Sequence, residues 1–158
     1  LMIFRKYFNY AKIYSFEPQI KHLKTQKKFL NNAKFYNFCL GNYNGTSEFN
    51  ITERDDSSSL LKPKKNIDDI YKVNRKIKIK VRRLDDILKL NKNETNLLKI
   101  DVQGFEYQVL LGAKKLLKKI DFIIIEISSA KSYHKEFDKK KSITYCLNNI
   151  IIFNKTII

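Results

Sequence analysis

The sequence predicts an α/β fold with a largely parallel sheet. Residues 96–128 carry this prediction, because they place a segment of helical periodicity between two apolar runs, "NLLKI" and "DFIIIEIS". Unbroken apolar runs are typical of parallel strands that are buried on both faces, and a helix between two such strands is the usual parallel crossover. The length of 158 residues suits one domain. We therefore expect residues 1–158 to form a single domain.

The first forty residues predict a strand, a helix and a second strand. "AKIYSFEP", residues 11–18, is an apolar run that ends at Pro18, because proline cannot donate to a strand ladder. Residues 19–34 place apolar side chains at moderate helical spacing, which predicts an amphipathic helix. "KFYNFCLG", residues 34–41, predicts a strand that ends at a glycine.

The middle of the chain predicts an antiparallel pair of strands. The turn signal "NYNG" leads into the strand candidate "TSEFNI", and residues 52–66 are expected to form a polar loop of low regularity. In "RKIKIKVRRL", residues 75–84, apolar and basic residues alternate, as in a half-exposed strand that is antiparallel or lies at a sheet edge. Its lysines are typical of edge protection, with a binding patch as the alternative.

Three further elements complete the predicted order. "LDDILKL", residues 84–90, predicts one or two helical turns. Residues 105–119 form the predicted crossover helix, because their apolar positions follow helical spacing closely. The tail, residues 141–158, predicts a helix and a final strand or hairpin.

The chain is strongly basic, with a net charge of +16 from 32 basic and 16 acidic residues. Such a charge suggests a polyanion partner. Only five of the basic residues are arginines, however, and arginine is the preferred group for base edges and phosphates. The richness in Lys, Asn and Ile, with few Gly and Pro, also matches AT-rich codon usage. We therefore expect no specific nucleic-acid partner, while a genuine polyanion surface stays open.

Cysteine usage and hydropathy predict a cytoplasmic protein. Cys39 and Cys146 have neither metal-binding nor redox spacing, which favours reduced thiols. No apolar run approaches the roughly 18 to 20 residues of a membrane helix, so we expect no membrane span. The first residues are interrupted by Arg5, Lys6 and Lys12 and do not resemble a signal peptide. The oligomeric state is left open.

Carboxylates follow or approach several predicted strand ends. Ligands of open parallel sheets bind beyond the carboxyl ends of the strands, so we expect Asp101 and Glu126 to converge on one site, with Glu17 farther along the same cleft. Structural alternatives are a solvated strand end for Glu17 and a helix cap for Asp101. Glu126 needs a partner or a wet strand end, because an unpaired charge is costly in an apolar strand. Glu106, two residues after Gly104, also suits a helix N-terminus.

Five sequence blocks follow one another along the chain in an order and spacing that are typical of one known protein family. They are "IYSFEP", "CLGNYNGTSEF", "SSSL", "VRRLDDIL" and "LLKIDVQGFEYQVLLGAKKLL" with "IDFIIIEIS" behind it. Together they resemble the FkbM family of S-adenosylmethionine-dependent methyltransferases from about residue 12 to residue 128. The combination of "KIDVQGFE" with "SFEP" upstream is the specific part of the resemblance.

The resemblance implies a class I methyltransferase fold, a doubly wound, mostly parallel Rossmann-like sheet with helices on both faces. It implies methyl transfer from S-adenosylmethionine to a hydroxyl of a small-molecule or glycan acceptor, such as a sugar, a lipid or a secondary metabolite. Carried over by position, Glu17 binds the cofactor ribose, and Asp101 and Glu106 are the catalytic candidates. Gly104 and Glu126 line the site.

The family carries a glycine-rich loop of the form D-x-G-A-N-x-G upstream of "SFEP", and residues 1–15 contain no glycine. We therefore expect a partial methyltransferase domain, a fragment or a shortened family member that lacks the first strand and this loop. The backbone amides of the loop contact the methionine part of the cofactor. This chain is accordingly expected to bind S-adenosylmethionine weakly or not at all.

Methyl transfer to a hydroxyl benefits from a positioned base. Asp101 is the first candidate for a base or for a group that orients the acceptor, Glu106 is the second and His134 the third, although a lone histidine among lysines is more often a surface residue. The sequence contains no His/Cys cluster that would predict a transition-metal site. Binding of a hard cation by Asp101 and a neighbouring residue stays open as an alternative. The rival predictions are a non-catalytic basic module that binds an anionic glycan or nucleic acid through "KPKK" and "KIKIK", or an inactive fragment.

Overall fold

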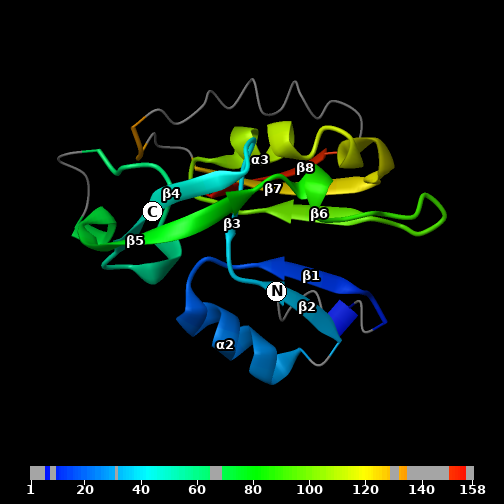
Figure 1. Ribbon diagram of the computed structural model, residues 1–158, viewed down its shortest axis with the longest axis horizontal. Helices are drawn as coiled ribbons and strands as arrows, with labels where there is room; N and C mark the ends of the chain where they lie inside the picture. The colour runs from blue at the N-terminus through cyan, green and yellow to red at the C-terminus, as the bar shows by residue number, and fades with distance from the viewer. Residues whose placement is uncertain are drawn as a thin grey trace. The chain divides into compact units, whose positions relative to one another are not determined.

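The computed structural model consists of two compact units, Leu1–Cys39 and Leu40–Ile158, which are described separately. Figure 1 shows their helices and strands. The structure describes residues 6–7, 10–30, 32–64, 69–128, 132–134 and 150–155. The prediction that residues 1–158 form a single domain stays a prediction.

The first unit contains two parallel strands and a helix. Strands β1 (Ile13–Phe16) and β2 (Ala33–Tyr36) are paired in register from Ile13 opposite Ala33 to Phe16 opposite Tyr36, and α2 (Ile20–Phe29) connects them. The strand predicted for residues 11–18 and the helix predicted for residues 19–34 are confirmed, although the helix ends at Phe29. The Ser15 hydroxyl donates to the Gln26 amide oxygen at 2.6 Å, which links β1 to α2.

The strand predicted for residues 34–41 is two short strands, β2 and β3 (Cys39–Leu40), the second of which spans the boundary between the units. Asn37 lies between them, and its side-chain amide donates to the carbonyl oxygens of Glu17 at 3.0 Å and Pro18 at 2.9 Å. This contact ties the end of β2 to the turn after β1. A contact of this kind depends on a residue about twenty positions away and leaves no local signal in the sequence.

The second unit begins with a sheet of order β3-β5-β4 (Figure 1), in which β4 and β5 are antiparallel. Strand β4 (Gly45–Thr52) pairs with β5 (Val73–Arg82), with Gly45 opposite Val81 and an irregularity after Ile51. The antiparallel pairing and the alternation predicted for residues 75–84 are confirmed. The apolar residues of β5 point inward, whereas its lysines are exposed.

The segment between β4 and β5 contains two 3₁₀-helices, η1 (Asp55–Ser57) and η2 (Asp69–Tyr71). Ser59 forms a bridge with Asn50, in which each backbone N–H donates to the other's carbonyl oxygen at 3.1 and 2.9 Å. The described part of residues 52–66 is a loop of low regularity, as predicted, but it is less exposed than a polar loop usually is, because three consecutive serines are buried here and find partners inside the unit: Ser57, Ser58 and Ser59.

The parallel sheet follows, in the order β6-β7-β8 (Figure 1). Strand β7 (Phe122–Ser128) pairs in parallel with β6 (Leu97–Ile100) on one side and with β8 (Ile150–Lys155) on the other. Helix α3 (Glu106–Gly112) connects β6 to β7. The core between them consists of Ile100, Val109, Leu110, Ile123 and Ile125.

These pairings confirm the central prediction that "NLLKI" and "DFIIIEIS" are parallel neighbours. The mixed α/β fold with parallel sheets is therefore established, whereas the doubly wound arrangement stays a prediction. The predicted final strand is β8, and the helix predicted in the same tail lies outside the described residues. Among the described residues, no helix is long and apolar enough to cross a membrane.

The helix predicted for residues 105–119 is interrupted. Helix α3 ends at Gly112, and a 3₁₀-helix, η4 (Leu116–Lys119), follows. The break has a tertiary cause, because the buried carboxylate of Asp85 accepts hydrogen bonds from the backbone N–H groups of Lys115 at 3.0 Å and Leu116 at 2.9 Å. Asp85 lies in η3 (Leu84–Asp86), the predicted helical turn, and it caps η4 from outside.

Candidate active site

The turn between β6 and α3 has an unusual backbone conformation. Gln103 has a φ of 53° and Gly104 a φ of 94°, so two successive residues adopt left-handed conformations. Glycine reaches this region freely, whereas any other residue there costs about 1–3 kcal/mol and is held by its surroundings. Such strain is concentrated at functional sites. The turn between β6 and α3 is therefore the leading candidate for a functional site.

Asp101 begins this turn and is held by two neighbours. Its Oδ2 accepts a hydrogen bond from Lys99 Nζ at 2.8 Å, and its Oδ1 accepts one from the Gln103 side-chain amide at 3.0 Å. The side chain is still 34% exposed, which leaves it accessible to a ligand. Its orientation is thus fixed by residues two positions before and two positions after it.

The environment of Asp101 favours the ionised carboxylate. Burial alone would raise its pKa, but the hydrogen bond and charge of Lys99, followed by hydrogen bonds with Glu126 and Gln103, outweigh it and lower the pKa below its ordinary value. An ionised carboxylate with a low pKa is a strong hydrogen-bond acceptor but a weak base. This balance suits orientation of an acceptor hydroxyl better than removal of its proton.

Glu126 reaches the same edge of the sheet as Asp101. Strands β6 and β7 are in register with Ile100 opposite Ile125, so Asp101 and Glu126 are the next residues on neighbouring parallel strands. The side chains are also close enough to interact, because Glu126 is among the groups that lower the pKa of Asp101. The two carboxylates therefore reach the same carboxyl edge of the sheet, as expected.

Glu106 and Gly104 close the turn. Glu106 is the first residue of α3, and its Oε1 accepts a hydrogen bond from the backbone N–H of Gly104 at 2.9 Å. This contact gives the Glu106 carboxylate a structural role in the turn, as the helix-start alternative predicted in part. The left-handed φ of Gly104 explains why glycine is needed there.

The sequence did not single out Ser59 and Gln103, which support the site. The buried Ser59 hydroxyl donates to the Gln103 carbonyl oxygen at 2.8 Å, so the loop after β4 holds the strained turn from outside. The only sequence feature that pointed to Ser59 was the "SSSL" block of the family resemblance, and the resemblance assigned no function to this block. The support depends on a contact across 44 residues, which no local pattern predicts.

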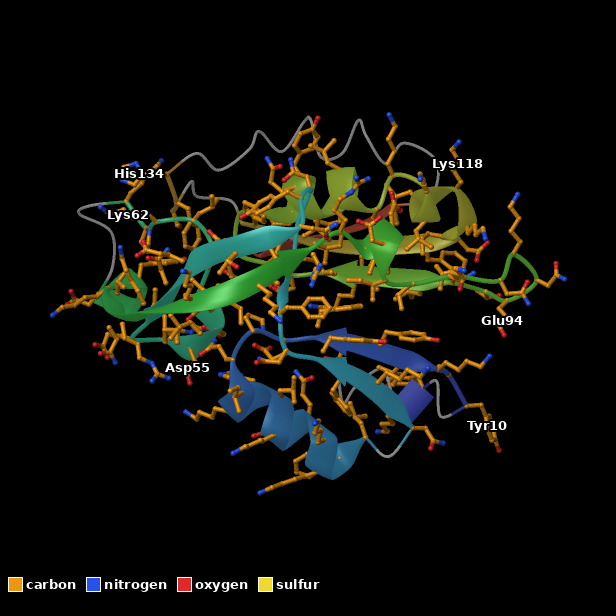
Figure 2. All side chains as sticks on the ribbon, viewed as in Figure 1. Tyr10, Asp55, Lys62, Glu94, Lys118 and His134 are labelled. Atoms are coloured by element: carbon orange, nitrogen blue, oxygen red, sulfur yellow. The ribbon has the colours of Figure 1, made fainter. Side chains whose placement is uncertain are left out.

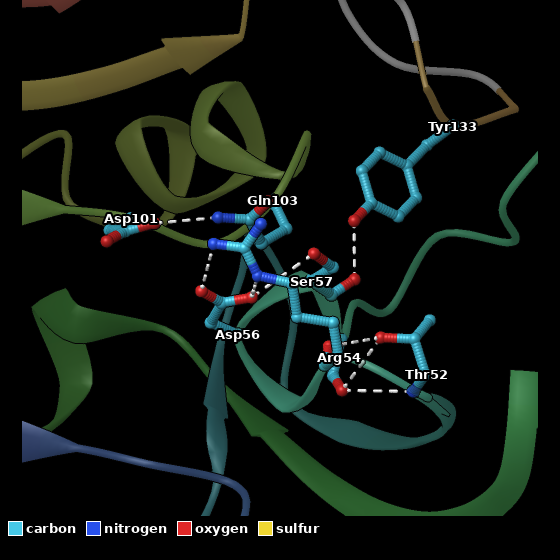
Figure 3. A network of polar contacts seen from close by, with 8 residues as sticks. Thr52, Arg54, Asp56, Ser57, Asp101, Gln103 and Tyr133 are labelled. Atoms are coloured by element: carbon cyan, nitrogen blue, oxygen red, sulfur yellow. Dashed lines mark hydrogen bonds and ion pairs between the residues drawn. The ribbon is translucent and has the colours of Figure 1, made fainter. Parts of the chain in front are cut away.

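The same loop carries a polar network. Arg54 forms an ion pair with Asp56 at 2.8 Å, and Figure 3 shows the Arg54 side chain extending from its loop toward Gln103 and Asp101. Tyr133 donates its hydroxyl to the Ser57 carbonyl oxygen. The backbone N–H of Thr52 donates to the Ser58 hydroxyl at 3.2 Å. The loop beside the candidate site is thus fixed at several points.

In the first unit, Glu17 follows β1 directly. Its Oε1 accepts a hydrogen bond from the backbone N–H of Gln19 at 2.8 Å, which orients the carboxylate. Its charge also acts on a neighbouring thiol: burial, and then the charge of Glu17, raise the pKa of Cys39 to about 12. The expectation that Glu17 lines the same cleft as Asp101 stays a prediction, because the two carboxylates belong to different units.

The family model for the methyltransferase FkbM domain matches residues 1–145. The chain belongs to the FkbM methyltransferase family. No curated protein and no solved structure matches it.

The third candidate base, His134, lies apart from the turn in its contacts. His134 is exposed and donates its backbone N–H to the Lys62 carbonyl oxygen at 2.8 Å, and Figure 2 shows both residues at the surface. Cys146 lies outside the described residues. In the part of the chain that the structure describes, no three His, Cys, Asp or Glu side chains are placed together to hold a metal ion.

Proposed function

We propose that this FkbM chain contributes the acceptor side of an S-adenosylmethionine-dependent methyltransferase that methylates a hydroxyl of a sugar, a lipid or a secondary metabolite. The observation that carries the proposal is the oriented, accessible and ionised carboxylate of Asp101 at the carboxyl edge of the parallel sheet. Ligands of parallel sheets bind at that edge.

The chain's own residues suit the cofactor as well. A carboxylate accepts several hydrogen bonds at once, so Glu17 can bind the two ribose hydroxyls while it retains its contact with the Gln19 N–H. When bound, the cofactor supplies an electrophilic methyl group on a sulfonium. Glu17 therefore serves in binding and positioning, and takes no part in bond making.

Asp101 acts on the acceptor. It accepts a hydrogen bond from the acceptor hydroxyl and aligns its oxygen for in-line attack, which is the main contribution that a methyltransferase makes. The acceptor hydroxyl would lose its proton to water or to the Asp101–Glu126 carboxylate pair, while the sulfonium, when bound, would lose its methyl group and leave as a neutral thioether. Lys99 and Gln103 act as positioning residues, because their side chains hold Asp101 by hydrogen bonds.

The test is Asp101→Asn in a version of the chain extended by the family's first strand and glycine-rich loop, because this change preserves size but removes the charge. We expect turnover per folded molecule to fall by about 10²-fold or more, in the range for misplacing a reacting group, while cofactor affinity changes little. A helix-capping role predicts the reverse, namely a lower melting temperature with turnover per folded molecule preserved. Retained turnover in the variant would remove Asp101 from the chemistry.

Cofactor binding is tested separately by calorimetry. It is measured on this chain and on a version extended by the family's first strand and glycine-rich loop, which is expected to bind S-adenosylmethionine more tightly. In the extended version, Glu17→Ala should weaken binding by roughly 1–3 kcal/mol, the range for lost hydrogen bonds to a charged group. Asp101→Asn is the matched control, since a group that contacts only the acceptor should leave this affinity unchanged.

A further inference from the structure

The outer face of β5 carries a row of four cationic side chains that the proposed methyl transfer does not use. Alternate residues of a strand point to the same face, and the four residues of this row are all exposed: Lys76, Lys78, Lys80 and Arg82. Two residues along a strand span about 6.6–6.8 Å, so the charges follow one another at that interval. These four residues are called the basic row.

Little negative charge opposes the basic row. On β4, Thr46 lies opposite Lys80 and Glu48 lies opposite Lys78. Glu48 forms an ion pair with Lys76 at 3.0 Å, but both side chains are about half exposed or more, at 68% and 48%. Exposed pairs of this kind are weak and are easily exchanged for another partner. The row therefore keeps a net positive charge along its length.

Edge protection is the structural alternative for these lysines. Strand β5 pairs with β4 along one side from Val73 to Val81, with one irregularity. On the other side β3 is only two residues long, and Gly41 N–H bonds to the Arg82 carbonyl oxygen at 3.0 Å. Edge protection makes a distinct prediction, because removal of the charges should then cause aggregation without loss of any ligand.

We propose that the basic row binds an extended anionic glycan, through its sulfate or carboxylate groups. A straight row of cations on a flat sheet face complements a linear polymer that carries repeated anions. The exposed side chains here, Thr46 and Glu48 with the basic row, include no aromatic ring. Single-stranded nucleic acids bind to basic surfaces that also stack the bases on aromatic rings, so this face suits sugars better.

Two features of the face fit a sugar polymer in particular. Lysine ammonium groups donate hydrogen bonds in three directions, so they can bind acidic groups and sugar hydroxyls alike. The hydroxyl of Thr46, beside Lys80, adds a short polar contact. The proposal does not depend on methyl transfer, because glycan binding is measured without cofactor and holds or fails independently of the Asp101 chemistry.

The experiment compares two variants of the full chain that carry the same charge. One replaces the row: Lys76→Gln, Lys78→Gln, Lys80→Gln and Arg82→Gln. The matched control replaces four exposed lysines elsewhere: Lys89, Lys92, Lys114 and Lys118, each by Gln. Each variant loses four positive charges, so the net charge falls from +16 to +12 in both (16 − 4 = 12).

Binding of a heparin-derived oligosaccharide is measured by fluorescence anisotropy at several salt concentrations. We expect the row variant to bind at least about tenfold more weakly, since several charge contacts are lost together, and the control variant to stay within about twofold. A neutral dextran oligosaccharide should not bind. A third variant, with arginine in place of Lys76, Lys78 and Lys80, should retain binding because it keeps the charges.

Several results would overturn the proposal. Equal losses in the row and control variants would mean that only net charge matters. Tighter binding of a single-stranded oligonucleotide or of phosphatidylserine vesicles than of the oligosaccharide would assign the row to another partner. Aggregation of the row variant, with unchanged binding per soluble molecule, would support edge protection. Circular dichroism of every variant ensures that folded proteins are compared.

Discussion

Two turns lead from a parallel strand into a helix, and each is closed by a glutamate. After β1, Glu17 accepts a hydrogen bond from the N–H of Gln19, and after β6, Glu106 accepts one from the N–H of Gly104. Only the second turn is strained, since all positive φ angles in the described chain belong to Gln103 and Gly104. The same type of contact, a glutamate carboxylate that accepts a backbone N–H hydrogen bond, thus occurs in a strained turn and in an unstrained one.

The comparison indicates which contacts allow a turn to keep a strained backbone. The first turn is held by Asn37, which follows the neighbouring strand β2 and donates to the carbonyl oxygens of Glu17 and Pro18. The second is held by a separate loop, through Ser59 and the carbonyl oxygen of Gln103. A strained turn with support from a distant loop is typical of a functional site, whereas the first turn shows no such strain and suits a binding role.

The largest stability difference between the turns should come from Gly104→Ala. A side chain at a φ of 94° is strained, so we expect a loss of about 1–3 kcal/mol in the free energy of unfolding. Pro18→Ala, the matched change in the first turn, should cost no more than about 1 kcal/mol. Chemical denaturation of both variants makes the comparison, and equal losses would show that the second turn is not the strained one.

The next largest difference concerns the buried serines. Ser59→Ala removes the hydrogen bond to the Gln103 carbonyl oxygen and leaves the Leu61 N–H without the serine oxygen, so we expect a loss of about 1–3 kcal/mol. Ser15→Ala in the first unit removes a single hydrogen bond to Gln26 and should cost about 1 kcal/mol. Only Ser59→Ala should also reduce turnover. Unchanged turnover would separate this support from the chemistry.

The two regions should also differ in their response to pH. The pKa of Cys39 is raised to about 12 by burial and by Glu17, so its stabilising contribution is complete below its ordinary pKa of 9.0 and is lost as pH rises toward 12. The pKa of Asp101 is lowered, so its contribution is present above the ordinary aspartate value of about 3.9 and is lost as pH falls through the lower folded pKa.

Stability is therefore measured against pH for the wild type, Cys39→Ala and Asp101→Asn. Cys39→Ala should reduce the pH dependence of the free energy of unfolding only at alkaline pH. Asp101→Asn should reduce it only at acid pH. A change in the same limb for both variants would contradict the assigned causes.

The smallest difference is expected for the two glutamates that close the turns. Glu17→Gln and Glu106→Gln each keep an amide oxygen that still accepts the backbone hydrogen bond, so each should change stability by only about 0.5–1 kcal/mol. Thermal melts of both variants provide the measurement. A much larger loss for Glu106→Gln would mean that its charge, beyond its hydrogen bond, holds the turn.

The sequence predicted the elements whose signals are local. The parallel neighbours β6 and β7 follow from two apolar runs around one helix, and the exposed lysines of β5 follow from strict alternation. The meeting of Asp101 and Glu126 follows from the rule that parallel strands end at one edge. The roles of these carboxylates stay proposals, because they depend on ligands that the chain alone does not specify.

The failures have a common physical cause, which is a contact from far away in the chain. Asn37 ends β2 by binding the turn after β1, and Asp85 breaks the predicted crossover helix by capping η4. The buried serines of residues 57–59 look like an ordinary polar loop until their partners are known. Periodicity and composition describe a segment by itself, so they miss all three.

The hydrogen bond from Ser59 to Gln103 also has a consequence for motion. It joins two segments 44 residues apart, so neither can open to solvent without releasing the other. The amide hydrogens of Asn50 and Ser59, which bond across the loop, should therefore exchange with deuterium at rates close to that of Gly104 in the turn. Ser59→Ala should uncouple them, so that the turn exchanges faster while the strand β4 keeps its protection.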